Sequence, residues 1–171
     1  MNTSINDSFK YQGIATLSLK IGDKTIVKSV HNEGTPQLKR AFAMFMCGGM
    51  VADEAKRYIP TRLDLRVDNF TALKKAVLIT NPSYYKEDFN SEVTWYVEYS
   101  AVIPFSSLIN PIDIAKNYKF YLMCDNGKDN WDESNDIAYI SVPGNDLKGL
   151  QSGVSVLVSW RLKILNNVPS N

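Results

Sequence analysis

The sequence predicts a mainly β protein, an antiparallel β-sandwich of the jelly-roll or Ig-like kind with about eight strands and one α-helix inserted after the first hairpin. Two observations support this prediction. Apolar residues recur at every second position in short runs separated by turn residues, which is the period of a strand with one buried face. These runs do not alternate with helical segments, as the strands of a parallel α/β sheet do.

Two alternating runs near the N-terminus predict a β-hairpin. The runs 14–21 and 25–30 both alternate, and Gly22-Asp23 lies between them. A two-residue connection that contains glycine is typical of a tight hairpin turn. We therefore expect these two runs to pair as antiparallel neighbours.

The segment 31–49 predicts the one substantial helix. Thr35 is a suitable N-cap residue, and Pro36 follows at the first helical position, where its missing N–H costs nothing. Gly48 and Gly49 stand where helices commonly end in a residue of positive φ. The apolar stripe that we expect to pack into the core comprises Leu38, Ala41, Phe42, Phe45 and Met46.

Further strands are predicted downstream from the same alternation. They are 62–68, 76–80, 92–103, 118–124, 137–142 and 154–165. The runs 92–103 and 154–165 have the strongest pattern, and 76–80 is short and apolar, as a buried strand is. The side chains expected to face inward on the two long strands are Val93, Trp95, Val97, Tyr99, Val156, Val158, Trp160 and Leu162.

Four stretches between the helix and the last strand lack this alternation. The charged segment 51–58 is interpreted as a short helical turn or a loop. The polar and aromatic segment 83–91 is predicted to be a long exposed loop, and 105–117 a crossover with one helical turn. Residues 143–146, Pro-Gly-Asn-Asp, predict a tight turn.

The chain is predicted to form a single domain, 1–171, with terminal arms at 1–10 and 166–171. Its formal net charge of +1 argues against nucleic acid as the main ligand, because phosphate recognition needs a basic excess. No apolar run approaches the roughly 20 residues that span a bilayer, and the N-terminus lacks the apolar core of a signal peptide. We therefore expect no membrane contact and synthesis in a cytoplasm, with Cys47 and Cys124 as free thiols.

The sequence predicts no catalytic residues, no cofactor-binding residues and no metal ligands. His31 is the single histidine, and it stands beside a predicted turn. Cys47 and Cys124 do not have the paired spacing of zinc ligands. Asp64 and Glu98 lie on predicted strands, but nothing in their spacing brings them together as a glycosidase pair.

The stretch 125–136 is acidic and contains a tryptophan. Its five carboxylates are hard oxygen ligands of the kind that Ca²⁺ takes, but their spacing is not that of an EF-hand loop, so we favour a solvated loop. Trp131 in this stretch is predicted to anchor a protein interface. Tyr84 and Tyr85 in the predicted loop 83–91 are expected to bind a partner in the same way.

Several short motifs are spread along most of the chain. They begin with the hairpin and the sequence His31-Asn32-x-Gly34-Thr35 before a predicted helix that ends at Cys47-Gly48. Later motifs are Tyr58-Ile59-Pro60, Trp95-Tyr96-Val97 in a long strand, and the closing pattern Gly153-x-Ser155-x-Leu157-x-x-Trp160-x-Leu162-x-Ile164. Together these motifs resemble small structural proteins of tailed bacteriophages, especially the crAss-like phages.

This resemblance implies a virion protein, either an auxiliary (decoration) capsid protein or a ring or tail component, and it carries no catalytic residues. The leading hypothesis is therefore a non-enzymatic subunit that binds the major capsid protein and copies of itself, made in the cytoplasm of the bacterial host. The competing hypothesis is a carbohydrate-binding β-sandwich, in which Tyr84, Tyr85, Trp131 and the acidic stretch would form a sugar platform with Ca²⁺. A sugar site would require these aromatic side chains in one concavity.

Overall fold

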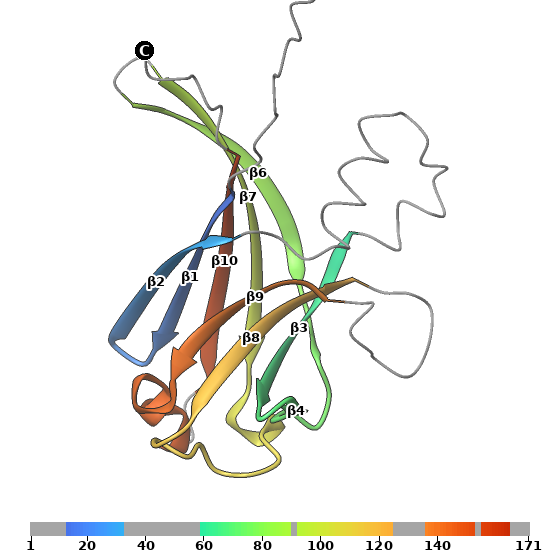
Figure 1. Ribbon diagram of the computed structural model, residues 1–171, viewed down its shortest axis with the longest axis vertical. Helices are drawn as coiled ribbons and strands as arrows, with labels where there is room; N and C mark the ends of the chain where they lie inside the picture. The colour runs from blue at the N-terminus through green and yellow to red at the C-terminus, as the bar shows by residue number, and fades with distance from the viewer. Residues whose placement is uncertain (1–12, 33–58, 90–91, 125–135, 153–154, 165–171) are drawn as a thin grey trace, which may run out of the picture.

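The protein is mainly β, with two antiparallel five-strand sheets packed face to face as a sandwich (Figure 1). The computed structural model describes residues 13–32, 59–89, 92–124, 136–152 and 155–164. The strand order is β2-β1-β10-β7-β6 in the first sheet, called sheet A, and β4-β3-β8-β9 in sheet B, where β5 also pairs with β3. The sandwich predicted from the sequence is confirmed.

The element bounds follow the predicted runs closely for the long strands. They are β1 (Gly13–Ile21), β2 (Lys24–Asn32), β3 (Pro60–Val67), β4 (Phe70–Thr71), β5 (Val77–Leu78), β6 (Thr80–Phe89), β7 (Glu92–Ile103), β8 (Asn117–Cys124), β9 (Asp136–Pro143) and β10 (Val156–Ile164). Within the described ranges, two 3₁₀ helices connect strands, η1 (Phe105–Ser107) and η3 (Gly144–Ser152).

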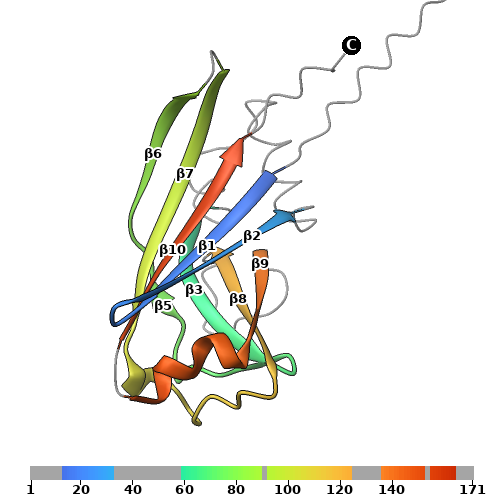
Figure 2. The same cartoon turned by 90° about the vertical axis from the view of Figure 1, so that its left-hand side faces the viewer.

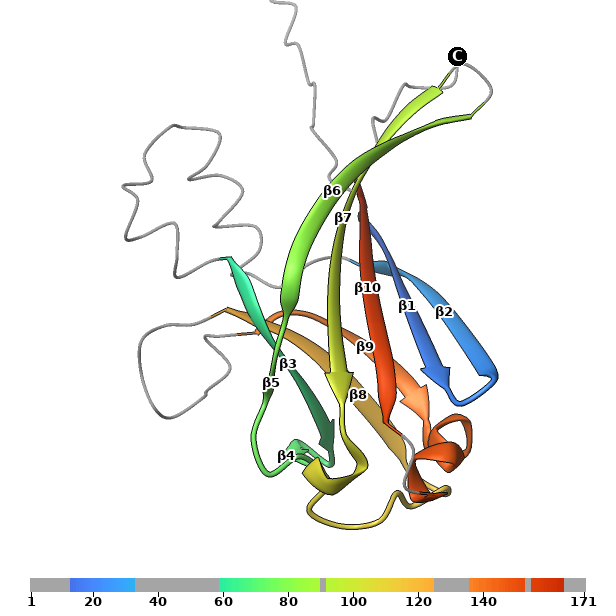
Figure 3. The same ribbon diagram turned by 180° about the vertical axis from the view of Figure 1, so that it is seen from behind.

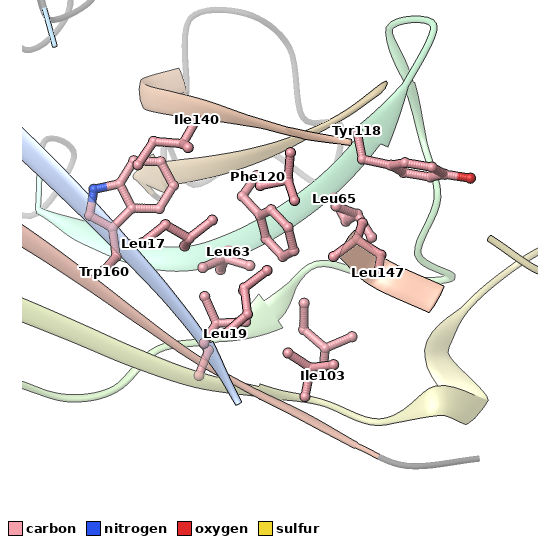
Figure 4. Packing of buried hydrophobic residues seen from close by; sticks show 14 of the residues in the cluster. Leu17, Leu19, Leu63, Leu65, Ile103, Tyr118, Phe120, Ile140, Leu147 and Trp160 are labelled. Carbon is pink, nitrogen blue, oxygen red and sulfur yellow. The ribbon is translucent and has the colours of Figure 1, made fainter. Parts of the chain in front are cut away.

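The core lies between the sheets and is filled mainly by inward-facing residues of β1, β3, β7, β8, β9 and β10 (Figure 4). Val156, Val158 and Trp160 of β10 are fully buried, as predicted, and Tyr99 of β7 is also buried. Trp160 and Phe120 are the largest fully buried side chains. The side chains of the remaining predicted inward residues are half-buried or lie outside the described part: Val97 packs against the core, and Val93, Trp95 and Leu162 are not described.

Two tight turns have the backbone conformation that their residues favour. Gly22 between β1 and β2 has φ +57°, which glycine adopts without a steric cost, and the predicted first hairpin is confirmed. Asp68 and Asn69 between β3 and β4 have φ +50° and +66°. Two successive residues of positive φ are typical of a type I′ turn, whose twist matches that of the flanking strands.

Three sequence predictions are wrong. The segment 83–91 is not a loop through residue 89, because it forms most of β6 and pairs with β7. Alternation did not reveal this strand, because an edge strand with polar side chains on both faces has no alternating pattern of apolar residues. The buried strand predicted at 76–80 is instead the two-residue β5, and its Leu78 is 66% exposed. The turn predicted at 143–146 is the start of η3.

Other predictions concern residues outside the described ranges. They include the helix predicted within 31–49, the segment 51–58, the arms 1–10 and 166–171, the acidic residues 125–135, and the side chains of Cys47 and Trp131. Cys124 lies in the described part, where its side chain is buried.

The two lateral sides of the sandwich are built differently (Figures 2 and 3). On one side β2 of sheet A approaches β9 of sheet B, and η3 closes the neighbouring end. On the other side the chain passes from sheet B to sheet A through β4, β5 and β6. We call this second side the β4–β6 edge.

Candidate functional site

Tyr84 and Tyr85 are neighbours on β6, and a strand points successive side chains to opposite faces. Tyr85 opposes Tyr96 of β7 and lies on the outer face of sheet A, where their rings stack with centroids 5.3 Å apart. Tyr84 opposes Val97 and lies on the side that faces sheet B, yet it is 77% exposed. The structure therefore does not place the two predicted partner-binding tyrosines on one surface.

Arg161 of β10 is the centre of a polar and aromatic group on the outer face of sheet A. Its guanidinium carbon lies 5.1 Å from the ring centroid of Tyr85 and 5.5 Å from that of Tyr96. Its Nη2 donates to Glu98 Oε2 at 3.2 Å, and the hydroxyl of Ser159 donates to Glu98 Oε1 at 2.8 Å. The carboxylate and the two rings thus hold the Arg161 side chain against the outer face of sheet A.

The surroundings of Tyr85 and Tyr96 raise the pKa of both phenols above the ordinary value for tyrosine. Burial raises the pKa of Tyr85, and the nearby Arg161 only partly opposes that effect. Burial and the carboxylate of Glu87 raise the pKa of Tyr96. Both phenols therefore keep their protons at neutral pH and remain hydrogen-bond donors with apolar ring faces.

The outer face of sheet B carries a second group, centred on Arg66 of β3. Its Nε donates to Asp64 Oδ2 at 2.9 Å, and Nη1 and Nη2 donate to the two carboxylate oxygens of Asp136 at 2.9 and 3.0 Å. Asp64 also accepts a 2.7 Å hydrogen bond from the hydroxyl of Thr71. The guanidinium lies 4.1 Å from the ring centroid of Tyr121. We call these five residues the Arg66 cluster.

The sequence did not indicate this cluster as a whole, because Asp136 lies 70 residues from Arg66 along the chain. Asp64 and Asp136 are 5% and 6% exposed, so the carboxylates are buried and need the cation that they have. The available signal was the sequence Asp64-Leu65-Arg66, which places opposite charges on one face of one strand.

The cluster also bears on two candidate sites considered from the sequence. Asp136, the last residue of the acidic stretch, begins β9, and Arg66 binds both of its carboxylate oxygens. It is therefore not part of a solvated loop. Asp64 lies on the outer face of sheet B and Glu98 on the outer face of sheet A, so the two carboxylates do not form a pair.

The β4–β6 edge carries the most exposed large apolar side chains that the structure describes. Phe70 of β4 is 76% exposed, Leu78 of β5 is 66% exposed, and Tyr84 of β6 is 77% exposed. All three belong to consecutive strands on one side of the sandwich, and exposed apolar surface on one side is a candidate interaction surface. The sequence did not indicate Phe70 or Leu78, because only the strand pairing shows that they stand at an edge.

The described residues contain neither a group suited to a metal ion nor a helix suited to span a membrane. No group of three or more His, Cys, Asp or Glu side chains within the described ranges could hold a metal ion. No helix in that part of the chain is long and apolar enough to cross a bilayer.

A scan against protein-family models finds no match, and neither do searches of curated proteins and of solved structures. The fold and its surfaces thus define the class, a two-sheet antiparallel β-sandwich.

Proposed function

We propose that this chain is a non-enzymatic structural subunit of a bacteriophage virion, most simply an auxiliary capsid protein that binds the major capsid protein and copies of itself. Its place would be the assembled particle, after synthesis in the cytoplasm of the bacterial host. The proposal rests on the sequence motifs that resemble phage structural proteins and on one structural observation, the β4–β6 edge.

The β4–β6 edge supports this proposal because of what it exposes. Phe70, Leu78 and Tyr84 bury little within their own chain, so their apolar surface contributes little to folding. The same surface would contribute to binding if a partner protein covered it, and aromatic side chains are the residues that most often dominate such contacts. Sheet edges also offer backbone groups to a partner.

Protein analysis of purified particles tests the proposal directly. Particles from a phage whose genome encodes the chain should contain it in a fixed ratio to the major capsid protein, through gradient purification and a high-salt wash. Absence of the chain from particles that contain the major capsid protein would exclude a virion role. A ratio far below that of the major capsid protein would instead favour a ring or tail position.

The edge residues provide a sharper version of this experiment. The double variant Phe70→Ser, Leu78→Ser should fold like the parent protein but enter particles less efficiently. Lys20→Ser on the exposed face of sheet A is a matched control, and it should leave incorporation unchanged. Equal incorporation of all three proteins would mean that the edge is not the assembly surface.

A carbohydrate-binding module is the second candidate, favoured by the stacked Tyr85–Tyr96 pair beside Glu98 and Arg161. Aromatic rings with neighbouring hydrogen-bonding groups are suited to sugars. A glycan array with the parent protein and Tyr96→Ala tests it. Binding that Tyr96→Ala abolishes supports the sugar function, and an array without signal argues against it.

A further inference from the structure

β6 is the outermost strand of sheet A, and its outer edge faces no other strand within the described part of the chain. It has 10 residues, whereas strands of five or six residues are usual. A long, open edge can pair with another strand unless something interrupts it. The interruptions in β6 are Pro82 and the irregular pairing between Thr80 and Ser83, and both come before residue 83. The segment 83–87 therefore pairs regularly with β7.

We propose that the segment 83–87 of β6 pairs with the same segment of a second copy, antiparallel and about a twofold axis at Tyr85. The two A sheets would then form one continuous sheet through the dimer. This inference specifies the contact between copies that the proposed function invokes and rests on it to that extent, but it concerns the isolated chain and can be tested without particles.

The side chains of this segment are complementary in that register. A twofold axis perpendicular to the sheet keeps both copies facing the same way, so residues of one face oppose each other. With Tyr85 opposite its own copy, Lys86 opposes Tyr84, and Ser83 opposes Glu87. A lysine ammonium beside an aromatic ring and a hydroxyl beside a carboxylate are both favourable neighbours.

The neighbouring symmetric registers are worse. A register centred on Lys86 places two lysines directly opposite each other, and one centred on Glu87 does the same with two glutamates, which is destabilising. A register centred on Tyr84 brings Pro82 into the ladder, where it lacks an N–H to donate. The sequence of the edge therefore selects a single register for pairing with a second copy.

The surroundings of the edge leave room for this pairing. Tyr84 is 77% exposed on the side facing sheet B, so sheet B does not cover β6 at this position. On the outer face, Tyr85 already stacks on Tyr96, and a second Tyr85 would extend the aromatic row across the twofold axis. The pairing thus adds to contacts that the isolated chain has formed.

Opposite charges at position 84 test the register. Sedimentation equilibrium of the purified full chain should show a dimer. Tyr84→Lys should raise its dissociation constant about tenfold, because each copy would oppose Lys86 with another lysine, whereas Tyr84→Glu should leave it unchanged or lower it. Both substitutions are at an exposed side chain, and circular dichroism should show parent-like folding. A monomeric parent, or equal effects of both charges, would overturn the inference.

A cross-link gives a second, independent readout. Tyr85→Cys should form a disulfide-linked dimer on a non-reducing gel, because position 85 opposes itself, and cross-strand Cα atoms lie about 4.5–5.5 Å apart. Glu87→Cys opposes position 83 and should cross-link no more than the parent protein. Preferential cross-linking at 87 would refute the register. A monomeric parent that still enters particles would refute this inference alone, and a dimer that is absent from particles would refute only the virion function.

Discussion

Arg66 on β3 forms a bidentate ion pair with Asp136 at the start of β9, across the full width of β8, which lies between the two strands. The two N–O distances are 2.9 and 3.0 Å. The same guanidinium binds Asp64 and lies over the ring of Tyr121. One cation therefore holds together the outer face of three strands of sheet B.

Replacing Arg66 with methionine should lower the free energy of unfolding by about 3 kcal/mol, because Asp64 and Asp136 would remain buried without their cation. Urea denaturation of the variant and the parent measures this change. Lys116→Ala is the control, since it removes an ion pair with Asp68 that is exposed to solvent, and it should hardly move the midpoint. Equal shifts for the two variants would show that the Arg66 cluster behaves as a surface ion pair.

Two phenylalanines in contrasting positions separate the core from the edge. Phe120→Ala should cost about 3–5 kcal/mol of stability, because a fully buried ring leaves a cavity. Phe70→Ala should cost less than about 0.5 kcal/mol, because this ring is 76% exposed. Thermal melting of both variants checks the contrast, and an early melt for Phe70→Ala would assign that ring to the fold instead of the edge.

The sequence makes a similar prediction for Phe42 and Trp131, both outside the described residues. Phe42→Ala should destabilise the isolated protein by roughly 3 kcal/mol through a core cavity. Trp131→Ala should leave its stability nearly unchanged but weaken incorporation into particles about thirtyfold, as loss of an interface anchor does. Melting curves and the amount of each variant in particles measure the two effects, and the reverse pattern would exchange the roles of the two residues.

Gly144 at the start of η3 should not tolerate a side chain. A Cβ at this position would overlap the carbonyl oxygen of Asp113 and lie 2.8 Å from that of Lys116, and both are backbone atoms that cannot rotate away. Gly144→Ala should therefore cost about 1–3 kcal/mol. Gly22→Ala is a useful comparison, because its Cβ would meet open space and its cost comes from φ alone. A smaller loss for Gly144→Ala than for Gly22→Ala would contradict this account.

Stability should fall at alkaline pH partly through Tyr121. Burial raises the pKa of Tyr121, and Arg66 only partly opposes it. A pKa raised in the folded state means that the protonated phenol favours folding, so this contribution is complete below the unfolded pKa of about 10 and is lost as the pH rises through the folded value. Tyr121→Phe should make the alkaline fall in denaturation midpoint shallower. An unchanged slope would show that Tyr121 ionises as freely in the folded protein as in the unfolded chain.

Metal removal should leave the melting temperature unchanged. The sequence favours a solvated stretch at 125–135, and Asp136 directs both carboxylate oxygens to Arg66. Melting with EDTA and with millimolar Ca²⁺ tests this prediction. A rise in melting temperature with Ca²⁺ that Asp129→Asn, Asp132→Asn abolishes would instead establish a calcium site in this stretch.

Alternation alone was sufficient for the long strands. In 154–165 the spacing placed Val156, Val158 and Trp160 in the core, because a strand has a period of two and the opposite face of this strand is mostly polar. The same reasoning failed at 83–91, where β6 is held by backbone hydrogen bonds to β7 instead of by a buried face. It also overestimated burial at 76–80, because local hydrophobicity does not show which strands stand at an edge.

For the candidate surfaces, the sequence by itself determined the residue types but not their grouping. It identified Tyr84 and Tyr85 as aromatic residues in a polar segment, and it determined the class of fold through the period of its apolar residues. Only the tertiary structure decided that these two tyrosines face opposite ways on one edge strand, and that Arg66 meets a carboxylate 70 residues away. The physical reason is that strand pairing joins distant segments through backbone hydrogen bonds, which carry no signature in the side chains of either segment alone.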